Sequence, residues 1–356
     1  MSAVALLGLL IAPVTGLKIG PGSSLESLAN GGPRVEVLHS LTDGGVGAGV
    51  LTPITVLVPA GDAQSAAEAV RGVDGVQMAV VGSTNGDSAV IDVFPSRATL
   101  DSDSSAIVTE IRAAVEPTVN GDVGITGVGP TIEDYMTAVY DKFPLVLALV
   151  GLITYPLLVR TFRSVLLPLK AVLINLLSLA AVFGAVVFFW QLGHGSALVF
   201  DVAPTGAINF WLPVVIFAFL FGLSMDYEVF ILTRMREEYD RTGDTSMAVI
   251  TGIGRTGRLV TSAALILFFS FAALATDPAT DAKVLGTALG VGILIDAVIV
   301  RALLVPALVS LFGTWNWWLP SWLARVLFVE PSPLHPVRVV PPEVLPEPDQ
   351  MPAGTS

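Results

Sequence analysis

Residues 210–239 read FWLPVVIFAFLFGLSMDYEVFILTRMREEY, a long apolar run that ends among charged residues. Residues 210–232 are long enough to cross a bilayer as one helix, which takes roughly 20 mostly apolar residues. Arg234 and Arg236 follow directly, at the point where a membrane span returns to water. The stretch therefore predicts a membrane-spanning helix, and the rest of the chain is interpreted around it.

Asp226 lies inside this predicted span, about two turns before its basic end. A carboxylate at that depth is costly unless it is paired, protonated or hydrated, so an acidic residue there is functional by default. The alternative is that Asp226 sits at the membrane edge and extends its carboxylate toward water. Tyr227 adds a hydroxyl donor beside Asp226, although an aromatic residue of the membrane interface would look the same.

The composition of the whole chain is that of a polytopic membrane protein. Of its 356 residues, 53% are hydrophobic and only 13% are charged, and the mean hydropathy is +0.76. A soluble domain of this size does not need so much apolar surface. The chain has no cysteine, which excludes disulfides and thiol chemistry. Its three histidines lie far apart, so we expect neither a metal site nor a cofactor.

An acidic segment at residues 18–142 interrupts the apolar sequence. It holds 6 Lys/Arg and 16 Asp/Glu, and so carries most of the net charge of −12. This charge argues against nucleic acid or an anionic lipid surface as its partner. Strand patterns at 51–59, 76–82, 89–95 and 122–127 alternate with helix patterns at 63–73 and 102–115. The order βαββαβ predicts a ferredoxin-like α+β domain.

Six membrane spans are expected around this domain. The first is the apolar segment 1–17, which is short for a span and could be truncated at its start or be a signal peptide. The other five form a predicted bundle over residues 143–327, with spans at 143–162, 165–192, 210–232, 259–275 and 284–312. Residues 234–254 predict a charged amphipathic helix in the cytoplasm. The Pro/Glu-rich tail at 328–356 is expected to be disordered and cytoplasmic.

The distribution of lysine and arginine predicts the orientation in the cell membrane. Outside the acidic domain, 10 of the 12 basic residues fall in the 160–170 segment, in the 234–258 segment or near the C-terminus. The positive-inside rule makes that side cytoplasmic. Six spans then place both termini in the cytoplasm and the acidic domain outside it.

A second acidic residue, Asp296, lies within the last predicted span. Its depth is within roughly 6 Å of that of Asp226, so the two carboxylates could face one another and exchange protons. Burial and a neighbouring like charge both favour the protonated form of a carboxyl. Arg301 adds a cation below Asp296, and a purely structural Asp296–Arg301 ion pair is the alternative interpretation. Glu228 is expected to face another direction and to support the end of its helix.

Three motifs resemble those of the MmpL family of resistance–nodulation–division (RND) transporters. The first is GLSMDYEVF at 222–230 followed by RMREEY at 234–239, which resembles the signature span of the family. The others are GRTGR at 254–258 and GILID at 292–296, the latter followed by Val300, Arg301 and Pro306. The resemblance covers residues 1–327 and is most specific at Asp226 and Tyr227.

The resemblance implies transport driven by the proton gradient, usually of lipids or hydrophobic small molecules. It implies that the acidic domain is an extracytoplasmic porter domain and that Asp226 and Tyr227 relay protons. Asp296 and Arg301 match motif positions and are further candidates for the relay. Family members usually contain two such halves, and this chain resembles the C-terminal one. Two copies could therefore pair as a homo-oligomer, or a separate N-terminal half could complete the transporter.

Two other interpretations stay open on the sequence alone. The chain could be a non-transporting membrane scaffold or lipid-binding protein, or an inactive truncated fragment. A membrane enzyme is disfavoured, because no nucleophile–base pair or metal-ligand spacing appears at a predicted membrane face.

Overall fold

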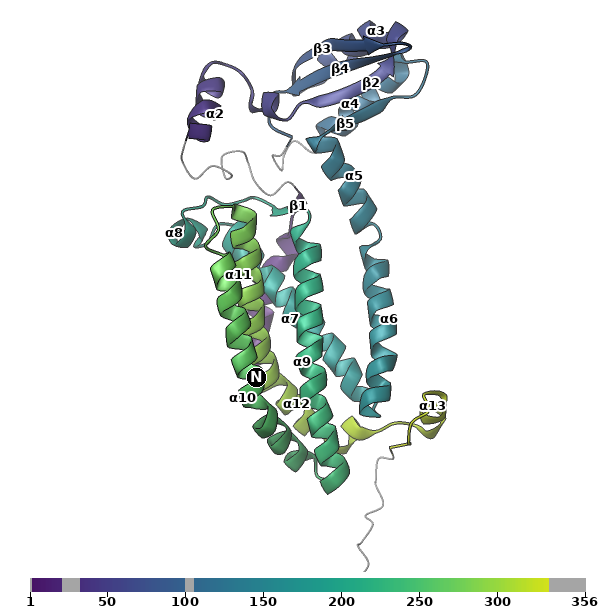
Figure 1. Ribbon diagram of the computed structural model, residues 1–356, viewed down its shortest axis with the longest axis vertical. Helices are drawn as coiled ribbons and strands as arrows, with labels where there is room; N and C mark the ends of the chain where they lie inside the picture. Colours follow the sequence, from purple (N-terminus) through teal and green to yellow (C-terminus); the bar gives the residue numbers. More distant parts are fainter. Residues whose placement is uncertain (1, 21–32, 100–105, 333–356) are drawn as a thin grey trace, which may run out of the picture.

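The computed structural model describes residues 2–20, 33–99 and 106–332 of the chain. The molecule is elongated, with a bundle of long helices at one end and a small α+β domain at the other (Figure 1). Most of the predicted tail, from residue 333 onward, lies outside the described residues.

Five helical segments of the described chain are long and apolar enough to cross a membrane. They comprise Val128–Phe162, Leu166–Gln191, Leu212–Thr242, Thr245–Leu274 and Thr280–Trp317. Their elements are α5 (Val128–Tyr140), α6 (Phe143–Phe162), α7 (Leu166–Val186) with the π-helical segment η5 (Val187–Gln191), α9 (Leu212–Thr242), α10 (Thr245–Leu274), α11 (Thr280–Leu294), the π-helical segment η6 (Ile295–Leu304) and α12 (Val305–Phe312). The chain is therefore a multi-pass membrane protein.

The segment expected as a first span is shorter than these five. It forms α1 (Ser2–Ile11) and the 3-10 turn η1 (Ala12–Gly16). This short apolar helix packs closely on α7, because Gly184 has no side chain: a Cβ there would lie 1.8 Å from the carbonyl oxygen of Leu10. Small residues permit such close approach between helices in a membrane.

The prediction of a separate cytoplasmic helix over residues 234–254 is wrong, because the end of α9 and the start of α10 share that segment. Gly243 ends α9 in the left-handed conformation with φ of 66°. Asp244 then caps α10, and its carboxylate accepts hydrogen bonds from the backbone N–H groups of Ser246 and Met247. This glycine–aspartate pair forms a tight turn between the two long helices. The turn depends on these two residues and is not visible in the pattern of hydrophobic residues.

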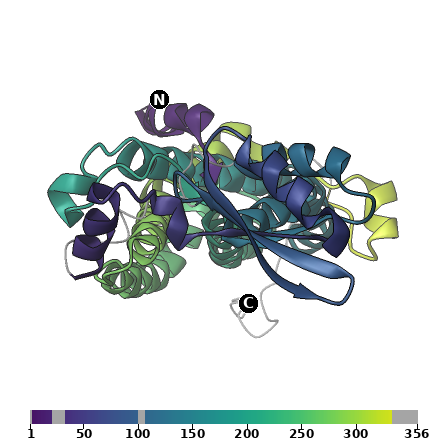
Figure 2. The ribbon, with the colours of Figure 1, turned by 90° about the horizontal axis from the view of Figure 1, so that it is seen from above.

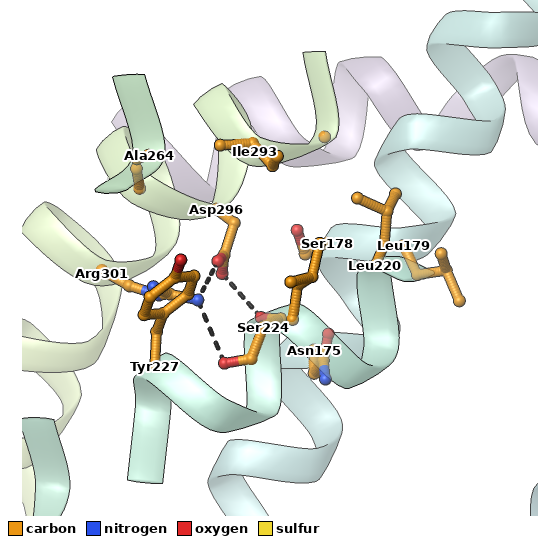
Figure 3. Close-up of a pocket in the computed structure, with 13 residues that line it drawn as sticks. Asn175, Ser178, Leu179, Leu220, Ser224, Tyr227, Ala264, Ile293, Asp296 and Arg301 are labelled. Carbon is orange, nitrogen blue, oxygen red and sulfur yellow. Dashed lines mark hydrogen bonds and ion pairs between the residues drawn. The ribbon is translucent and has the colours of Figure 1, made fainter. Parts of the chain in front are cut away.

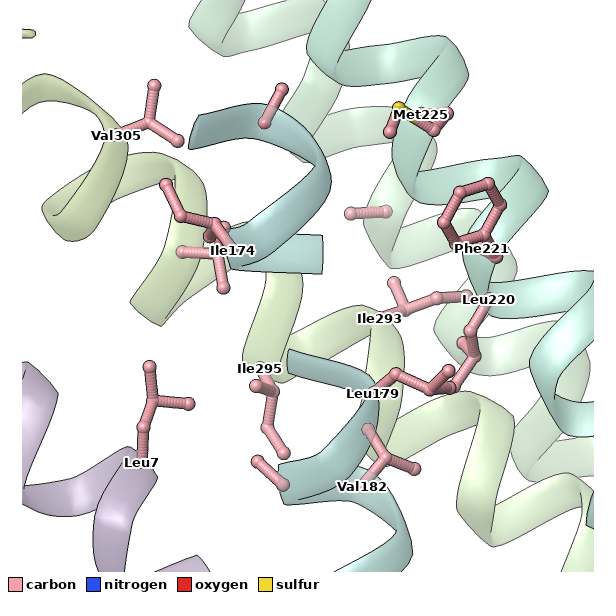
Figure 4. Close-up of a cluster of buried hydrophobic side chains, with 14 of the residues drawn as sticks. Leu7, Ile174, Leu179, Val182, Leu220, Phe221, Met225, Ile293, Ile295 and Val305 are labelled. Carbon is pink, nitrogen blue, oxygen red and sulfur yellow. The ribbon is translucent and has the colours of Figure 1, made fainter. Parts of the chain in front are cut away.

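The core of the bundle lies where α7, α9 and α11 with η6 meet. Leu179, Leu220 and Ile293 come from these three elements and pack together (Figure 4). Gly292 allows the contact, because a Cβ at that position would lie 2.7 Å from a methyl carbon of Leu220. The core therefore holds the middle of α9 directly against the junction of α11 and η6.

The α+β domain contains a four-stranded antiparallel sheet with the order β3-β4-β2-β5. Its elements are β2 (Ile54–Pro59), α3 (Ala63–Arg71), β3 (Val76–Asn85), β4 (Ser88–Pro95), α4 (Ile107–Val115) and β5 (Gly124–Gly127), preceded by α2 (Pro33–Asp43). Apolar side chains of the strands and of α3 and α4 form a core separate from that of the bundle. Seen from above, the sheet and its helices lie over the ends of the membrane helices (Figure 2).

Both connections between the α+β domain and the bundle reach the start of α9. On the way into the domain, β1 (Ile19–Gly20) pairs in parallel with β6 (Ile208–Asn209), just before α9. On the way out, the Tyr140 hydroxyl donates a hydrogen bond of 2.6 Å to the carbonyl oxygen of Phe210. The ring of Tyr135 contacts the ring of Phe210 edge to face, with centroids 4.9 Å apart. A movement of α9 would therefore reach both connections.

The opposite end of α9 is fixed by Arg236, whose side chain is only 7% exposed. Its guanidinium donates to the carbonyl oxygens of Arg163 and Trp317 and to the Ser332 hydroxyl. It also forms an ion pair of 3.0 Å with Asp240, one turn along the same helix. These contacts join the α6–α7 connection and the segment around α13 (Ser321–Val326) to α9.

Candidate functional site

A buried ion pair between Asp296 and Arg301 lies where η6 contacts α9 (Figure 3). The Ser224 hydroxyl donates a hydrogen bond of 2.9 Å to the Asp296 carboxylate. The Arg301 guanidinium donates to the Ser224 carbonyl oxygen at 3.1 Å and lies over the ring of Tyr227, 4.8 Å from its centroid. The side chains of Arg301 and Asp296 are 5% and 13% exposed. The pair therefore joins two helices inside the bundle.

The π-helical form of η6 makes this ion pair possible within one helix. In an α-helix, side chains five residues apart point about 140° away from each other. In a π-helix the backbone hydrogen bonds join residues i and i+5, so the fifth residue lies close to directly below the first. Asp296 and Arg301 have this spacing, and both lie within the π-helical segment Ile295–Leu304. Single π-helical turns inside α-helices are frequent at functional sites.

A small cavity lies beside the ion pair, between α7, α9 and η6. Its volume is about 20 Å³, enough to hold a water molecule. Asn175 and Ser178 contribute polar atoms from α7, and Asp296, Arg301 and Tyr227 line the other side (Figure 3). The cavity gives a water molecule room next to the Asp296 carboxylate, within an otherwise apolar core.

Asp226, the acidic residue predicted to be central, does not lie in this cavity. It is exposed on the surface of α9, and no hydrogen bond or ion pair joins its carboxylate to another described residue. Ser224 faces Asp296, and a residue two positions further along an α-helix points about 200° away. The structure thus brings Tyr227, Asp296 and Arg301 together, whereas the expected meeting of Asp226 with Asp296 does not occur within this chain.

Glu228 is the buried acidic residue of α9 that faces Asp296 and Arg301, the position predicted for Asp226. It is only 5% exposed, and its carboxylate interacts electrostatically with both Asp296 and Arg301. The expectation that Glu228 faces away from the site was wrong. Its spacing of four residues from Ser224 places the two on the same face of α9, and this was the signal that could have identified it.

Across residues 2–20, 33–99 and 106–332, no three His, Asp or Glu side chains are placed to hold a metal ion. The chemistry that the arrangement offers is therefore that of two buried carboxylates, one guanidinium, a phenol and a hydroxyl. Such ionisable groups inside a membrane bundle mark proton or ion pathways.

The fold and this site define the chain as a multi-pass membrane protein with an ionisable centre inside its helix bundle. Residues 53–334 match the model of the MMPL family, and the chain belongs to this family. The family prediction made from the motifs at residues 222–239, 254–258 and 292–306 is thereby confirmed.

The relatives include exporters and an uptake protein. The mycolic acid-containing lipids exporter MmpL11 of Mycolicibacterium smegmatis is 38% identical over 309 residues, which cover 81% of this chain and 32% of that protein. The heme uptake protein MmpL11 of Mycobacterium tuberculosis is 35% identical, over 92% of this chain and 35% of its own length. The trehalose monomycolate exporter MmpL3 of M. smegmatis is 35% identical, over 63% of this chain and 22% of its own length. The chain spans about a third of the length of the two MmpL11 proteins.

Proposed function

We propose that this chain is one half of an exporter for lipids or hydrophobic small molecules that is driven by the proton gradient. The observation that carries the proposal is the buried Asp296–Arg301 ion pair, held by Ser224 and Tyr227 of α9. The names of two relatives as lipid exporters support the choice of cargo.

In the proposed mechanism, Asp296 takes up a proton through the water-sized cavity. Protonation removes the negative charge that holds the Arg301 guanidinium, which keeps its contacts with the Ser224 carbonyl and the Tyr227 ring. The carboxylate of Glu228 is then the second anion available to Arg301. Because a π-helical turn is rarely stable, this exchange of partners favours a shift of η6 toward α-helical geometry.

The movement reaches the α+β domain through the start of α9. Tyr140 and the β1–β6 pairing connect both ends of that domain to this point. In the proposal the domain is an extracytoplasmic porter domain with a ferredoxin-like fold. Segment 1–17 is the first of six spans, and both termini are cytoplasmic.

Asp226 takes part in the proposed relay from the other side of α9. A carboxylate exposed on a membrane helix needs a partner to avoid contact with lipid. In the proposal, that partner is supplied by a second copy of this chain or by a separate N-terminal half. Asp226 and Tyr227 thus face two different surfaces, one toward the partner half and one toward Asp296 and Arg301.

The proposal is tested by replacing Asp296 with asparagine. Infrared difference spectra of the reconstituted chain, recorded between acidic and alkaline pH, should lose a carboxyl band in Asp296→Asn, and cells should lose export of a fluorescent lipid analogue. Asp87→Asn, a change at an exposed residue of the α+β domain, is the matched control. Unchanged export by Asp296→Asn at equal abundance would refute the relay.

A further inference from the structure

The short helix α13 projects from the side of the bundle, at the end opposite the α+β domain (Figure 1). The membrane segment that carries Asp296 and Arg301 leads into it, through α12 and the 3-10 segment η7 (Gly313–Trp317). The helix at the ion pair is therefore continuous in sequence with α13.

The inner face of α13 is fixed to the bundle. Ala324 is buried in one cluster with Val159 of α6 and with Leu319, which precedes α13. The Arg160 guanidinium, from the last turn of α6, donates a hydrogen bond of 2.7 Å to the carbonyl oxygen of Leu327, just after α13. These contacts hold α13 beside the end of α6.

The outer face of α13 is also apolar. Trp322 and Val326 lie one turn apart, and each is 64% exposed. Phe328, just beyond the helix, is 87% exposed and has a left-handed backbone with φ of 54°, which a bulky residue adopts rarely and at an energetic cost. A strained backbone beside large exposed apolar side chains indicates a surface that contacts something other than water.

Two arginines without acidic partners border this face. Arg325 of α13 and Arg160 of α6 are both exposed, and residues 313–329 contain no acidic residue. No salt bridge joins either arginine to another residue within 2–20, 33–99 and 106–332. A guanidinium binds phosphate oxygens with two parallel hydrogen bonds. The face therefore combines apolar side chains with groups suited to phosphate.

The position of α13 favours a bilayer over a protein as its partner. It lies beside the last turns of α6, which belongs to the membrane segment Val128–Phe162, and the surface of the surrounding bilayer is at this level. Tryptophan is enriched at membrane interfaces, and arginines near an anionic leaflet are attracted to it.

We infer that α13 is an interfacial anchor that binds acidic phospholipids of the leaflet opposite the α+β domain. Its apolar outer face reaches the acyl chains, and Arg160 and Arg325 bind headgroup phosphates. These lipids belong to the bilayer and are not the exported cargo. The inference is therefore independent of the proposed function, since it requires neither transport nor proton uptake.

The test uses the full chain in lipid nanodiscs with one fluorescent label. The chain has no cysteine, so Val326→Cys carries the only bimane group. Brominated lipids quench a fluorophore that they contact. Brominated phosphatidylglycerol should quench this label about fivefold more strongly than an equal fraction of brominated phosphatidylcholine, the factor for one arginine near an anionic surface. High salt should reduce this ratio, because it screens exposed charges.

Two label positions serve as controls. A label at Asp87→Cys, in the α+β domain and exposed, should be quenched by neither lipid. A label at Ile266→Cys, on α10 and 67% exposed, should be quenched equally by both, because the middle of a span has no headgroup contact.

Substitutions of the arginines test the charge. In the Val326→Cys chain, Arg325→Gln should lower the ratio toward equality, Arg325→Lys should retain most of it, and Arg160→Gln combined with Arg325→Gln should abolish it. Gel filtration verifies that each variant is folded. Asp296→Asn should leave the ratio unchanged, so failure of the proton relay is measured separately.

Two results would overturn the inference. A label at position 326 that neither lipid quenches would show that water or a protein covers α13. Equal quenching by the two lipids in the chain with both arginines would show that α13 has no preference for acidic phospholipids.

Discussion

Asp296 and Arg301 form an ion pair across five positions of a single helix because the intervening backbone is π-helical. The pair therefore depends on local backbone geometry as well as on charge. An ordinary α-helix at this place would turn Arg301 away from Asp296. A change in the protonation of Asp296 and a change in the backbone of η6 are thus expected to occur together.

The first prediction separates a relay from a structural ion pair. Asp296→Leu removes the carboxylate that pairs directly with the buried Arg301 guanidinium, and we expect a loss of about 3–5 kcal/mol in the free energy of unfolding. Adding Arg301→Met should restore most of this stability, because paired removal of buried charges is often neutral or stabilising. Unfolding in detergent measures the stability of each variant. Export should be lost in both, and normal export by the double variant would show that the pair is only structural.

The second prediction concerns Glu228. Glu228→Gln removes a buried carboxylate that interacts with Arg301, and we expect the initial rate of lipid export to fall about tenfold, corresponding to about 1.4 kcal/mol. The control is Glu237→Gln on the same helix, whose side chain is 54% exposed and pairs with Arg234 at the surface. Surface pairs of this kind contribute little, so its rate should stay within about twofold of the unmodified chain. Equal rates in the two variants would exclude Glu228 from the site.

Much of the bundle could be predicted because membrane spans are long apolar runs. The bounds expected for the span at 143–162 are those of α6. The order of strands and helices expected over 51–127 is also the order observed, because turn residues separate the elements. The turn at Gly243 and Asp244 was not predicted. Charged residues lie on both sides of it, and together they resemble a single amphipathic helix.

The orientation of the site residues could not be predicted in the same way. α9 is apolar around most of its circumference, so its hydrophobic pattern does not show which face meets the core. The choice between Asp226 and Glu228 as the buried acid therefore depended on packing against η6. The π-helical backbone of η6 brings Asp296 and Arg301 together. No residue type in this segment indicates a π-helix, so the contact could not be predicted from the sequence.

The third prediction tests the connection from α9 to the α+β domain. Tyr140→Phe removes the hydrogen bond to the Phe210 carbonyl oxygen, which contributes about 1 kcal/mol, while the ring packing remains. We expect lower export with an unchanged infrared signal from Asp296, because proton uptake occurs elsewhere in the bundle. Tyr155→Phe, which removes a hydroxyl that donates to the Val165 carbonyl oxygen at the other end of α6, is the control. A simultaneous loss of the infrared signal would show that Tyr140 acts on the site itself.

The last prediction concerns the exposed face of α9. Gly222 and Asp226 are one turn apart on this face, and a Cβ at Gly222 would meet no atom within 4 Å. A membrane carboxylate facing lipid is unfavourable, so we expect another half-transporter to cover this surface.

The chain has no cysteine of its own, so single cysteines report contacts directly. Gly222→Cys should form a cross-link in membranes, either between two copies or to a co-expressed N-terminal half. Leu173→Cys, on α7 and 51% exposed, should form none, because that position is expected to face lipid. Cross-linking at both positions would indicate random collision. If Gly222→Cys forms no cross-link to any chain, Asp226 has no protein partner, and the paired assembly is refuted.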